Sequence, residues 1–215
     1  MLPRLLTADA CGSVIARLGE FDGSAGSRDL LEREWCHLLS QELRDHSDVA
    51  GLLPAGHDVV QCNFFDKSAE KNWLVGLHQD LSVPVAERVD TPGLSGWCVK
   101  QGQTFVQAPR ELLQDLLVLR LHLEDCGPDD GPLRVVPASH RQGVLEPEAA
   151  RALRDRSGET ICCVGGGGVL AMRPLLLHAS SKSTGLGRRR VLHFVYGPAE
   201  PGWGLQWPQL TSMRC

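Results

Sequence analysis

The chain has 215 residues, 42% of them hydrophobic, so it can bury a core and is not expected to be disordered. A formal net charge of −4 and an aromatic content of 5% give no reason to expect nucleic acid or an anionic membrane surface as a partner. The start does not resemble a signal peptide, no run of 18 apolar residues occurs, and eight cysteines lack Cys-x-x-Cys spacing. We therefore expect one cytoplasmic domain, residues 1–215, with reduced thiols.

The first third of the chain is predicted to be helical. Thr7 is the expected N-cap of a helix within residues 7–21, where apolar residues recur at helical spacing: Cys11, Val14, Ile15 and Leu18. Residues 27–46 are predicted to form a second helix, with an apolar stripe of Leu31, Trp35, Leu38 and Leu39. A loop rich in Gly and Ser, residues 21–28, joins the two.

From residue 58 the pattern changes to short apolar segments separated by clusters of Gly, Pro and Asp. About eight strands are expected, within residues 58–65, 72–78, 104–109, 116–125, 133–140, 160–164, 169–180 and 189–197. A short helix, residues 146–156, interrupts them. Helices followed by a run of strands predict a mainly β fold with flanking helices. The expected architecture is a double-stranded β-helix, of the jelly-roll or cupin-like type, whose core starts near residue 58.

The apolar segment NWLVGLHQDLSVPV, residues 72–85, contains His78 and Asp80 two positions apart. Residues i and i+2 of a strand share a face, so this imidazole and carboxylate would meet inside the fold. They could supply two ligands of a 2-His-1-carboxylate site for Fe(II), which leaves three coordination positions open. His178, which ends the apolar run RPLLLHASS, is the candidate third ligand. The alternatives are a buried His–Asp hydrogen bond and a core histidine.

Three consecutive arginines, Arg188, Arg189 and Arg190, open the last predicted strand soon after His178. Arginine binds carboxylates through two parallel hydrogen bonds, so one inward arginine would hold the free carboxylate of a 2-keto acid that chelates iron at its other end. Side chains alternate between the two faces of a strand, so Arg188 and Arg190 share one face and Arg189 lies on the other. This alternation does not say which face is inward. A solvated basic turn is the alternative.

Four segments together, LHQD, DDGPLRVVPASH, RPLLLHASS and RRRVLHFVYG, resemble the phytanoyl-CoA dioxygenase-like family of Fe(II)/2-oxoglutarate-dependent oxygenases. The resemblance runs in the same order over residues 59–197. It implies that three residues bind the metal: His78, Asp80 and His178. It also implies that Arg189 binds 2-oxoglutarate, because the family's arginine follows the distal histidine by about eleven residues.

Two further contacts to 2-oxoglutarate are implied by the resemblance. Ser180 matches a position that can touch the same carboxylate as the arginine. Arg120 and His122 share a strand face from which the family often supplies another contact, so either could serve, although some relatives carry an aromatic residue where Arg120 stands. Trp73 and Asn72 are candidates for the entrance, as are residues 87–103 and 197–207. Lys67 and Lys71 are interpreted as solvated.

The resemblance implies an enzyme that uses Fe(II), 2-oxoglutarate and O2, hydroxylates a small-molecule substrate and releases succinate and CO2. Related halogenases lack the carboxylate ligand, so Asp80 favours hydroxylation. One alternative is a catalytically inactive jelly-roll module that binds a metal or small molecule. A weaker alternative is a zinc hydrolase with the same three ligands, but no Glu adjoins them to act as a base.

Overall fold

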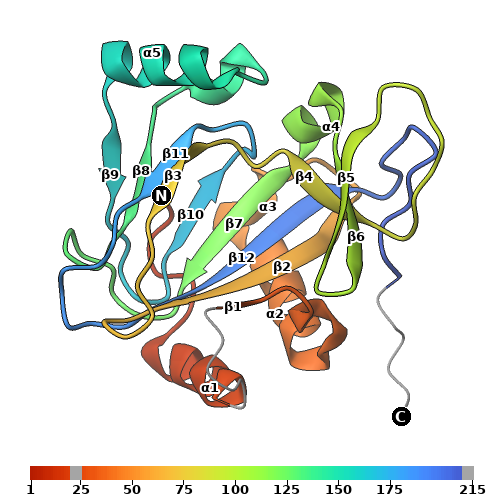
Figure 1. Ribbon diagram of the computed structural model, residues 1–215. Coiled ribbons are helices and arrows are strands. Elements are labelled where there is room, and N and C mark those ends of the chain that lie inside the picture. Colours follow the sequence, from red (N-terminus) through yellow and green to blue (C-terminus); the bar gives the residue numbers. More distant parts are fainter. Residues whose placement is uncertain (20–25, 210–215) are drawn as a thin grey trace.

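The computed structural model describes residues 1–19 and 26–209 (Figure 1). Its strands form a five-stranded sheet, β1-β2-β12-β7-β10, a four-stranded sheet, β3-β11-β8-β9, and a three-stranded sheet, β4-β6-β5, with every pairing antiparallel. The five-stranded and four-stranded sheets face each other as the two walls of a jelly roll. The predicted fold class is therefore confirmed.

The strands are bounded as follows: β1 Gly26–Ser27, β2 His57–Lys67, β3 Val75–His78, β4 Ser82–Val85, β5 Ser95–Lys100, β6 Gln103–Gln107, β7 Leu117–His122, β8 Leu133–Val135, β9 Thr160–Cys162, β10 Val169–Met172, β11 His178–Ser180 and β12 Arg189–Pro198. The helices are α1 Ala8–Leu18, α2 Glu34–Asp45, α3 Ser47–Ala50, α4 Arg110–Asp115 and α5 Pro147–Ser157, with 3-10 turns at Leu30–Glu32 and Ser139–Gln142.

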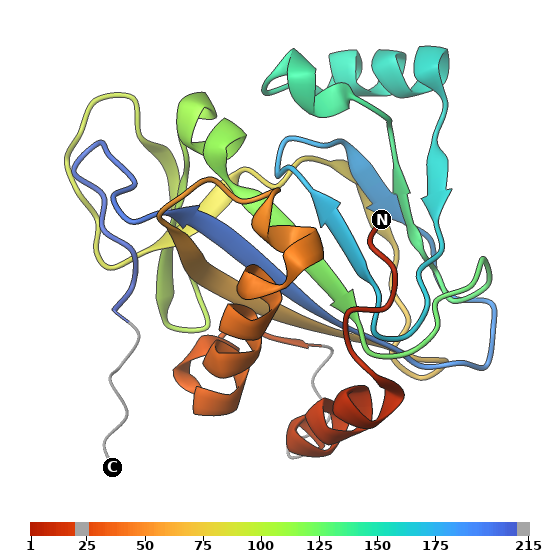
Figure 2. The same cartoon turned by 180° about the vertical axis from the view of Figure 1, so that it is seen from behind.

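Each face of the five-stranded sheet packs on a different core. The helices α1, α2 and α3 cover its outer face, as the view from behind shows (Figure 2). Leu39 and Leu43 of α2 pack there against Phe194 and Tyr196 of β12. The inner face contributes Val60, Val118 and Val195 to a second core shared with the other sheets. Strand β12 is therefore buried on both faces, which explains its nearly continuous apolar sequence.

The predicted first helix is confirmed, and Thr7 caps it by accepting a hydrogen bond from the Ala10 amide at 3.2 Å. The prediction of one continuous helix over residues 27–46 was wrong, and so was part of its predicted buried face. Arg33 has an extended backbone that separates the Leu30–Glu32 turn from α2, so residues on either side do not share one stripe. Leu38 is 54% exposed. Leu31 and Leu39 of the predicted stripe are buried, and the buried side of α2 consists of Cys36, Leu39, Ser40 and Leu43.

All eight predicted strand segments contain a strand, and residues 169–180 contain two, β10 and β11. Strands β4 and β5 were missed, and β5 lies inside residues 87–103, which were expected to be a loop. Strand β4 contains Pro84, which is tolerated because β4 is an edge strand. A bulge with a positive φ at Gly96 interrupts β5 and obscures its pattern.

Several other expectations concern the chain as a whole. Of the predicted loop 21–28, residues 21–25 lie outside the described residues, and Gly26–Ser27 form β1. Seven cysteines are free thiols, as expected, and Cys215 lies outside the described residues. No helix in the described ranges is long and apolar enough to cross a membrane. A single domain over residues 1–215 stays a prediction.

Candidate metal centre

The structure brings His78, Asp80 and His178 together, with one ligand atom of each within 4.8 Å of the others. The two histidines lie directly opposite each other on β3 and β11, and Asp80 follows β3 two residues later. The Asp80 carboxylate lies between them: Oδ1 is 3.6 Å from His78 Nε2, and Oδ2 is 3.7 Å from His178 Nε2. Both distances are too long for hydrogen bonds, so the three groups could hold an ion.

Backbone carbonyls fix the tautomer of both histidines. Nδ1 of His78 lies 2.9 Å from the Gly76 oxygen, and Nδ1 of His178 lies 2.8 Å from the Leu176 oxygen. A carbonyl oxygen only accepts hydrogen bonds, so each Nδ1 carries the proton and, in a neutral ring, each Nε2 has a free lone pair. Burial lowers the pKa of His178 to about 4, which keeps that ring neutral at pH 7. Metal-binding histidines are commonly oriented in this way.

Asp80 is an ionised carboxylate with an unsatisfied oxygen. Burial by itself would raise the pKa of Asp80, but the nearby histidines, His178 first, hold it well below its usual range. Its Oδ2 is buried and has no hydrogen-bond partner among the described residues. A buried anionic oxygen without a partner is costly, and a cation would satisfy it. Two imidazoles, each of which would bind a metal in its neutral form, and one carboxylate are a donor set that suits a divalent transition metal such as Fe(II).

Gln79, between the two candidate ligands, holds this backbone in place. Its side chain points away from the metal centre and is buried. Nε2 donates to the Leu175 and Gly143 carbonyls at 2.6 and 2.8 Å, and Oε1 accepts from the Leu145 amide at 2.8 Å. The Asp80 amide donates to the Pro174 carbonyl at 2.9 Å. The segment that presents the carboxylate is thereby tied to the turn between β10 and β11.

Of the three consecutive arginines, only Arg189 faces the interior. Arg188 binds Asp66 through two hydrogen bonds of 2.7 Å, with half of its side chain exposed. Arg190 binds Glu124 through its backbone and its guanidinium. Arg189 is buried and donates from Nη1 to the Gly131 carbonyl at 2.5 Å, while its Nε has no partner among the described residues. A buried guanidinium without a carboxylate partner is available to an anionic ligand.

Ser180 and Lys67 lie beside Arg189. Lys67 is opposite Arg189 in the pairing of β2 with β12, and its Nζ donates to the Ser180 hydroxyl at 3.3 Å and the Ser181 carbonyl at 2.8 Å. Its exposure is 1%, so the interpretation of Lys67 as solvated was wrong. Burial, and then the charges of Arg189 and Arg120, lower its pKa to about 8. Lys71 contacts Asp66 at 3.3 Å and is about a quarter exposed.

Arg120 connects this basic region to the metal centre through His193. The two residues are opposite each other on β7 and β12, and Arg120 Nη1 lies 2.8 Å from His193 Nδ1. A guanidinium only donates, so Nδ1 of His193 accepts and its proton is on Nε2, which is 3.9 Å from Asp80 Oδ2. His193 therefore directs an N–H towards Asp80 and offers no lone pair to a metal. His122 is buried on the same face, with no hydrogen-bond partner for either nitrogen among the described residues.

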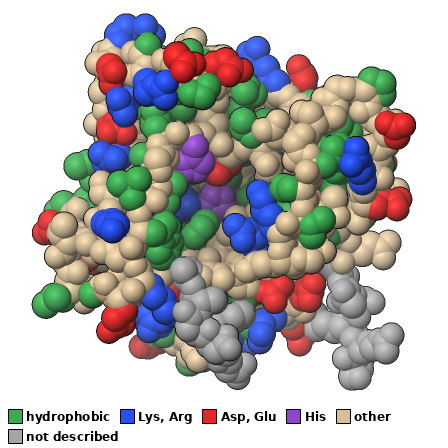
Figure 3. Space-filling model, in the orientation of Figure 1, with side chains coloured by type: hydrophobic (Ala, Val, Ile, Leu, Met, Phe, Trp, Pro, Cys, Tyr) green, Lys and Arg blue, Asp and Glu red, His purple; other side chains and the backbone are tan. Residues whose placement is uncertain are grey.

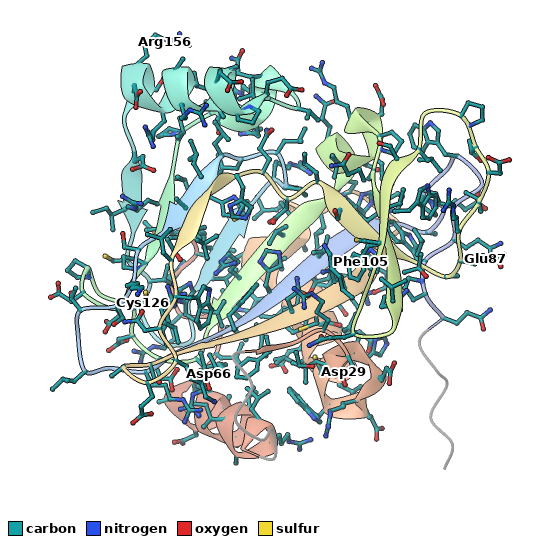
Figure 4. All side chains as sticks on the ribbon, in the orientation of Figure 1. Asp29, Asp66, Glu87, Phe105, Cys126 and Arg156 are labelled. Atoms are coloured by element: carbon teal, nitrogen blue, oxygen red, sulfur yellow. The ribbon has the colours of Figure 1, made fainter. Side chains whose placement is uncertain are left out.

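A cavity of about 350 Å³ opens over these groups. Figure 3 shows the hollow from its open side, with histidine and acidic side chains on the floor and basic side chains beside them. Figure 4 shows the side chains that the two facing sheets carry, together with those of the rest of the molecule. The described lining includes the candidate ligands, Arg120, Ser180, Arg189 and Trp73. Asn72 instead exchanges hydrogen bonds with the Ser183 backbone, at 2.7 and 2.8 Å. The two segments expected at the entrance, residues 87–103 and 197–207, contribute one residue, Lys100, to the described lining.

Sequence reasoning missed Lys67 and His193 for different reasons. Lys67 is followed by the polar run SAEKN, which favours a solvated interpretation. His193 shares the face of Arg189 by alternation, so the choice of Arg189 as the inward arginine could have identified it. Arg28 also lines the cavity and comes from a segment that was expected to be a loop.

Three comparisons place this geometry among known proteins. The model of the family Phytanoyl-CoA dioxygenase (PhyH) matches residues 4–191. A search of curated proteins with the sequence finds no match. Solved structures that share the fold include HygX from Streptomyces hygroscopicus with nickel and 2-oxoglutarate bound, with a TM-score of 0.62 and 19% identity over 92% of this chain and 81% of that one.

Two further structures have similar scores. The non-heme alpha ketoglutarate dependent carbocyclase SnoK from nogalamycin biosynthesis has a TM-score of 0.64 and 15% identity, over 93% of this chain and 79% of that one. EctD from S. alaskensis with bound Fe has a TM-score of 0.63 and 19% identity, over 97% of this chain and 72% of that one. At these identities the likeness is one of fold.

Proposed function

The chain belongs to the phytanoyl-CoA dioxygenase family, and on that premise we propose that it is an Fe(II)- and 2-oxoglutarate-dependent oxygenase that hydroxylates a small molecule. The observation that carries the proposal is the cavity itself. Three metal-binding side chains, one with an unsatisfied oxygen, lie in the same cavity as a buried arginine that has no carboxylate partner. Of the solved structures named above, HygX contains nickel and 2-oxoglutarate, and EctD contains iron.

We assign His78 Nε2, His178 Nε2 and the Asp80 carboxylate as the metal ligands. When Fe(II), 2-oxoglutarate and O2 are bound, they supply oxidation of a substrate C–H bond, coupled to decarboxylation of 2-oxoglutarate to succinate. The carbonyls of Gly76 and Leu176 hold the two imidazoles in the tautomer that can bind a metal. Three protein ligands would leave coordination positions on the ion open to a bidentate co-substrate and to O2.

The free carboxylate of 2-oxoglutarate is assigned to Arg189, with Ser180 and Lys67 beside it. Arg189 has unsatisfied donor capacity, and Ser180 lies within hydrogen-bonding distance of Lys67. Arg120 was predicted as a further contact. It stays a candidate for that role: Nη1 contacts His193, and its buried Nε has no hydrogen-bond partner among the described residues. The apolar side chains in the cavity lining, such as Leu116 and Val118, would limit the access of water to the reacting groups.

Hydroxylation is proposed over halogenation because the third ligand is a carboxylate, which leaves no place for a halide. SnoK, which shares the fold, is an alpha ketoglutarate dependent carbocyclase, so product analysis must decide between hydroxylation and ring closure. The zinc-hydrolase alternative lacks support, since Asp80 is the sole carboxylate among the described lining residues and no second one could act as a base. A cytoplasmic location and the absence of a nucleic-acid partner stay predictions.

The test is an anaerobic titration of Fe(II) and 2-oxoglutarate into the protein, followed by the weak visible charge-transfer band of the chelate. We expect the band in the wild type, its loss in His78→Ala, and a requirement for far more 2-oxoglutarate in Arg189→Ala. Arg188→Ala is the matched control, because that arginine points outward to Asp66. His140→Ala is the control for His78→Ala, since His140 borders a separate cavity.

Turnover is measured next as succinate released in air. No band and no succinate from the wild type would contradict the proposal. If the band appears but no succinate forms, not even by turnover that is uncoupled from substrate oxidation, the protein is the inactive binding module. Normal 2-oxoglutarate affinity in Arg189→Ala would show that the co-substrate carboxylate is bound elsewhere.

A further inference from the structure

The charges that line the cavity are unbalanced in one direction. The described lining contains four basic side chains, from Arg28, Lys100, Arg120 and Arg189. It contains one carboxylate, that of Asp80. The whole chain has a formal net charge of −4, so the excess is local to the cavity. In the proposed function, Asp80 binds the metal, Arg189 binds 2-oxoglutarate and Arg120 binds His193. Arg28 and Lys100 then have no assigned role.

Arg28 and Lys100 reach the cavity from two separate segments. Arg28 follows β1, which pairs with β2 beside the cavity-lining Asn63. Lys100 ends β5, and its Nζ is 4.9 Å from the centre of the Phe105 ring, which is also in the lining. Figure 4 labels Phe105 and Asp29, the neighbour of Arg28, on the same side of the molecule.

Neither cation is neutralised by the protein. Within residues 1–19 and 26–209, no carboxylate forms an ion pair with Arg28 or Lys100, and neighbouring Asp29 contacts Ser27 instead. Other arginines of the chain, such as Arg188 and Arg190, are paired with acidic residues. Unpaired cations at the opening of a cavity attract anions and orient them as they enter.

Part of the cavity lining forms an apolar wall, which consists of Val83, Phe105, Leu113, Leu116, Val118 and Val195. Gln61, Asn63 and Ser82 add polar groups to the same lining. A ligand in this space would place a hydrocarbon body against that wall and a charged group at the opening. Pockets of this kind fix orientation with a few polar groups and gain affinity from apolar contact.

We propose, on the basis of the proposed function, that the substrate is a small amphipathic acid whose anionic group binds between Arg28 and Lys100. Its apolar body lies along the wall and presents a C–H bond to the metal. Carboxylates and phosphate esters share this chemistry. The assignment gives the cavity two anion sites, with the deeper one, at Arg189, kept for 2-oxoglutarate.

The experiment is calorimetric titration of protein that holds Ni(II) and saturating 2-oxoglutarate, so the deeper site is filled and no turnover occurs. The probes are a panel of carboxylic acids, such as phenylpropanoate and octanoate, with their primary amides and the matching alkyl phosphates. We expect at least one acid or phosphate to bind about tenfold more tightly than its amide. The acid and phosphate series distinguish the two kinds of anion.

Variants then locate the anion. Arg28→Gln and Lys100→Gln should each weaken binding of the best anion about fivefold, as expected for exposed charges, and leave the amide unaffected. Arg156→Gln is the matched control, because this exposed arginine lies at the far end of α5 (Figure 4). Any of four results would overturn the proposal. No anion binds, the amides bind as tightly as the acids, both variants keep the wild-type affinity, or the anion displaces 2-oxoglutarate. If the oxygenase assignment itself is wrong, the charge-transfer band of the Fe(II)–2-oxoglutarate chelate will be missing, which distinguishes that failure from a failure of this proposal.

Discussion

The strongest residue-level consequence concerns the charge of Lys67. Burial lowers the pKa of this ammonium to about 8, so it is charged at pH 7 and loses its proton as the pH rises through 8 to 9. The charged form favours a dianionic co-substrate beside Arg189. Binding of 2-oxoglutarate in turn raises the pKa of Lys67, so the loss of affinity extends above pH 8.

We therefore expect the Kd of 2-oxoglutarate to rise by up to about tenfold per pH unit above pH 8. Lys67→Met should bind about tenfold more weakly at pH 7 and should lack this rise. Calorimetry with Ni(II) between pH 7 and 9.5 measures both effects. Lys71→Met, a lysine close by in the sequence and partly exposed, is the control and should follow the wild type. A rise of equal size in Lys67→Met would exclude Lys67 as its origin.

His122 offers a prediction about stability. Both of its ring nitrogens are buried without a partner among the described residues, so His122→Leu should raise the free energy of unfolding by about 1 kcal/mol at pH 7. Burial, and then Arg120, lower its pKa to about 3 from an ordinary 6.5, so the unfolded chain binds a proton between these values that the folded chain does not. The wild type should therefore lose stability on acidification below pH 6.5.

His122→Leu lacks this proton uptake, so its advantage should widen as the pH falls, by at most about 1.4 kcal/mol per unit. Urea unfolding of both proteins at pH 7, 6 and 5 measures the difference. A variant that is less stable than the wild type at every pH would mean that the imidazole has a favourable role which its buried nitrogens do not indicate.

Among the secondary-structure elements, β12 shows what the sequence could and could not predict. Its alternation separates Arg189 from Arg188 and Arg190, but the strand is buried on both faces, so hydrophobicity does not mark the inner one. The inward face follows from partners distant in sequence: Asp66 and Glu124 bind the outer two arginines. The His78–Asp80 pair could be recognised because both are polar residues in an apolar segment, although Asp80 itself lies just beyond β3. Lys67 could not be recognised, since its burial depends on the packing of β11.

The outer face of β12 gives a prediction about helix docking. Tyr196 is fully buried, and its hydroxyl donates a hydrogen bond to the Ser40 carbonyl of α2 at 2.7 Å. Tyr196→Phe leaves that carbonyl without this donor and should lower the free energy of unfolding by about 1 kcal/mol. Urea unfolding measures the loss, and metal affinity serves as the control. A large fall in Ni(II) affinity would contradict the separation of this face from the metal centre.

At the scale of the whole molecule, the candidate site joins the two walls of the jelly roll. The proposed metal ligands lie on or beside β3 and β11 of the four-stranded sheet, whereas Arg189 and Lys67 lie on β12 and β2 of the five-stranded sheet. A co-substrate that chelates the metal at one end and binds Arg189 at the other would therefore cross-link the sheets. Metal alone would bind a single wall.

This arrangement predicts how ligands stabilise the protein. A ligand that binds only the folded state stabilises it by RT ln(1 + [L]/Kd), about 2.7 kcal/mol at one hundred times Kd. We expect Ni(II) to raise the melting temperature, and 2-oxoglutarate to add a second increment only when Ni(II) is present. Arg189→Ala should keep the first increment and lose the second, whereas His78→Ala should lose both. Differential scanning calorimetry separates these cases, and an increment from 2-oxoglutarate without metal would show that the co-substrate binds one wall independently.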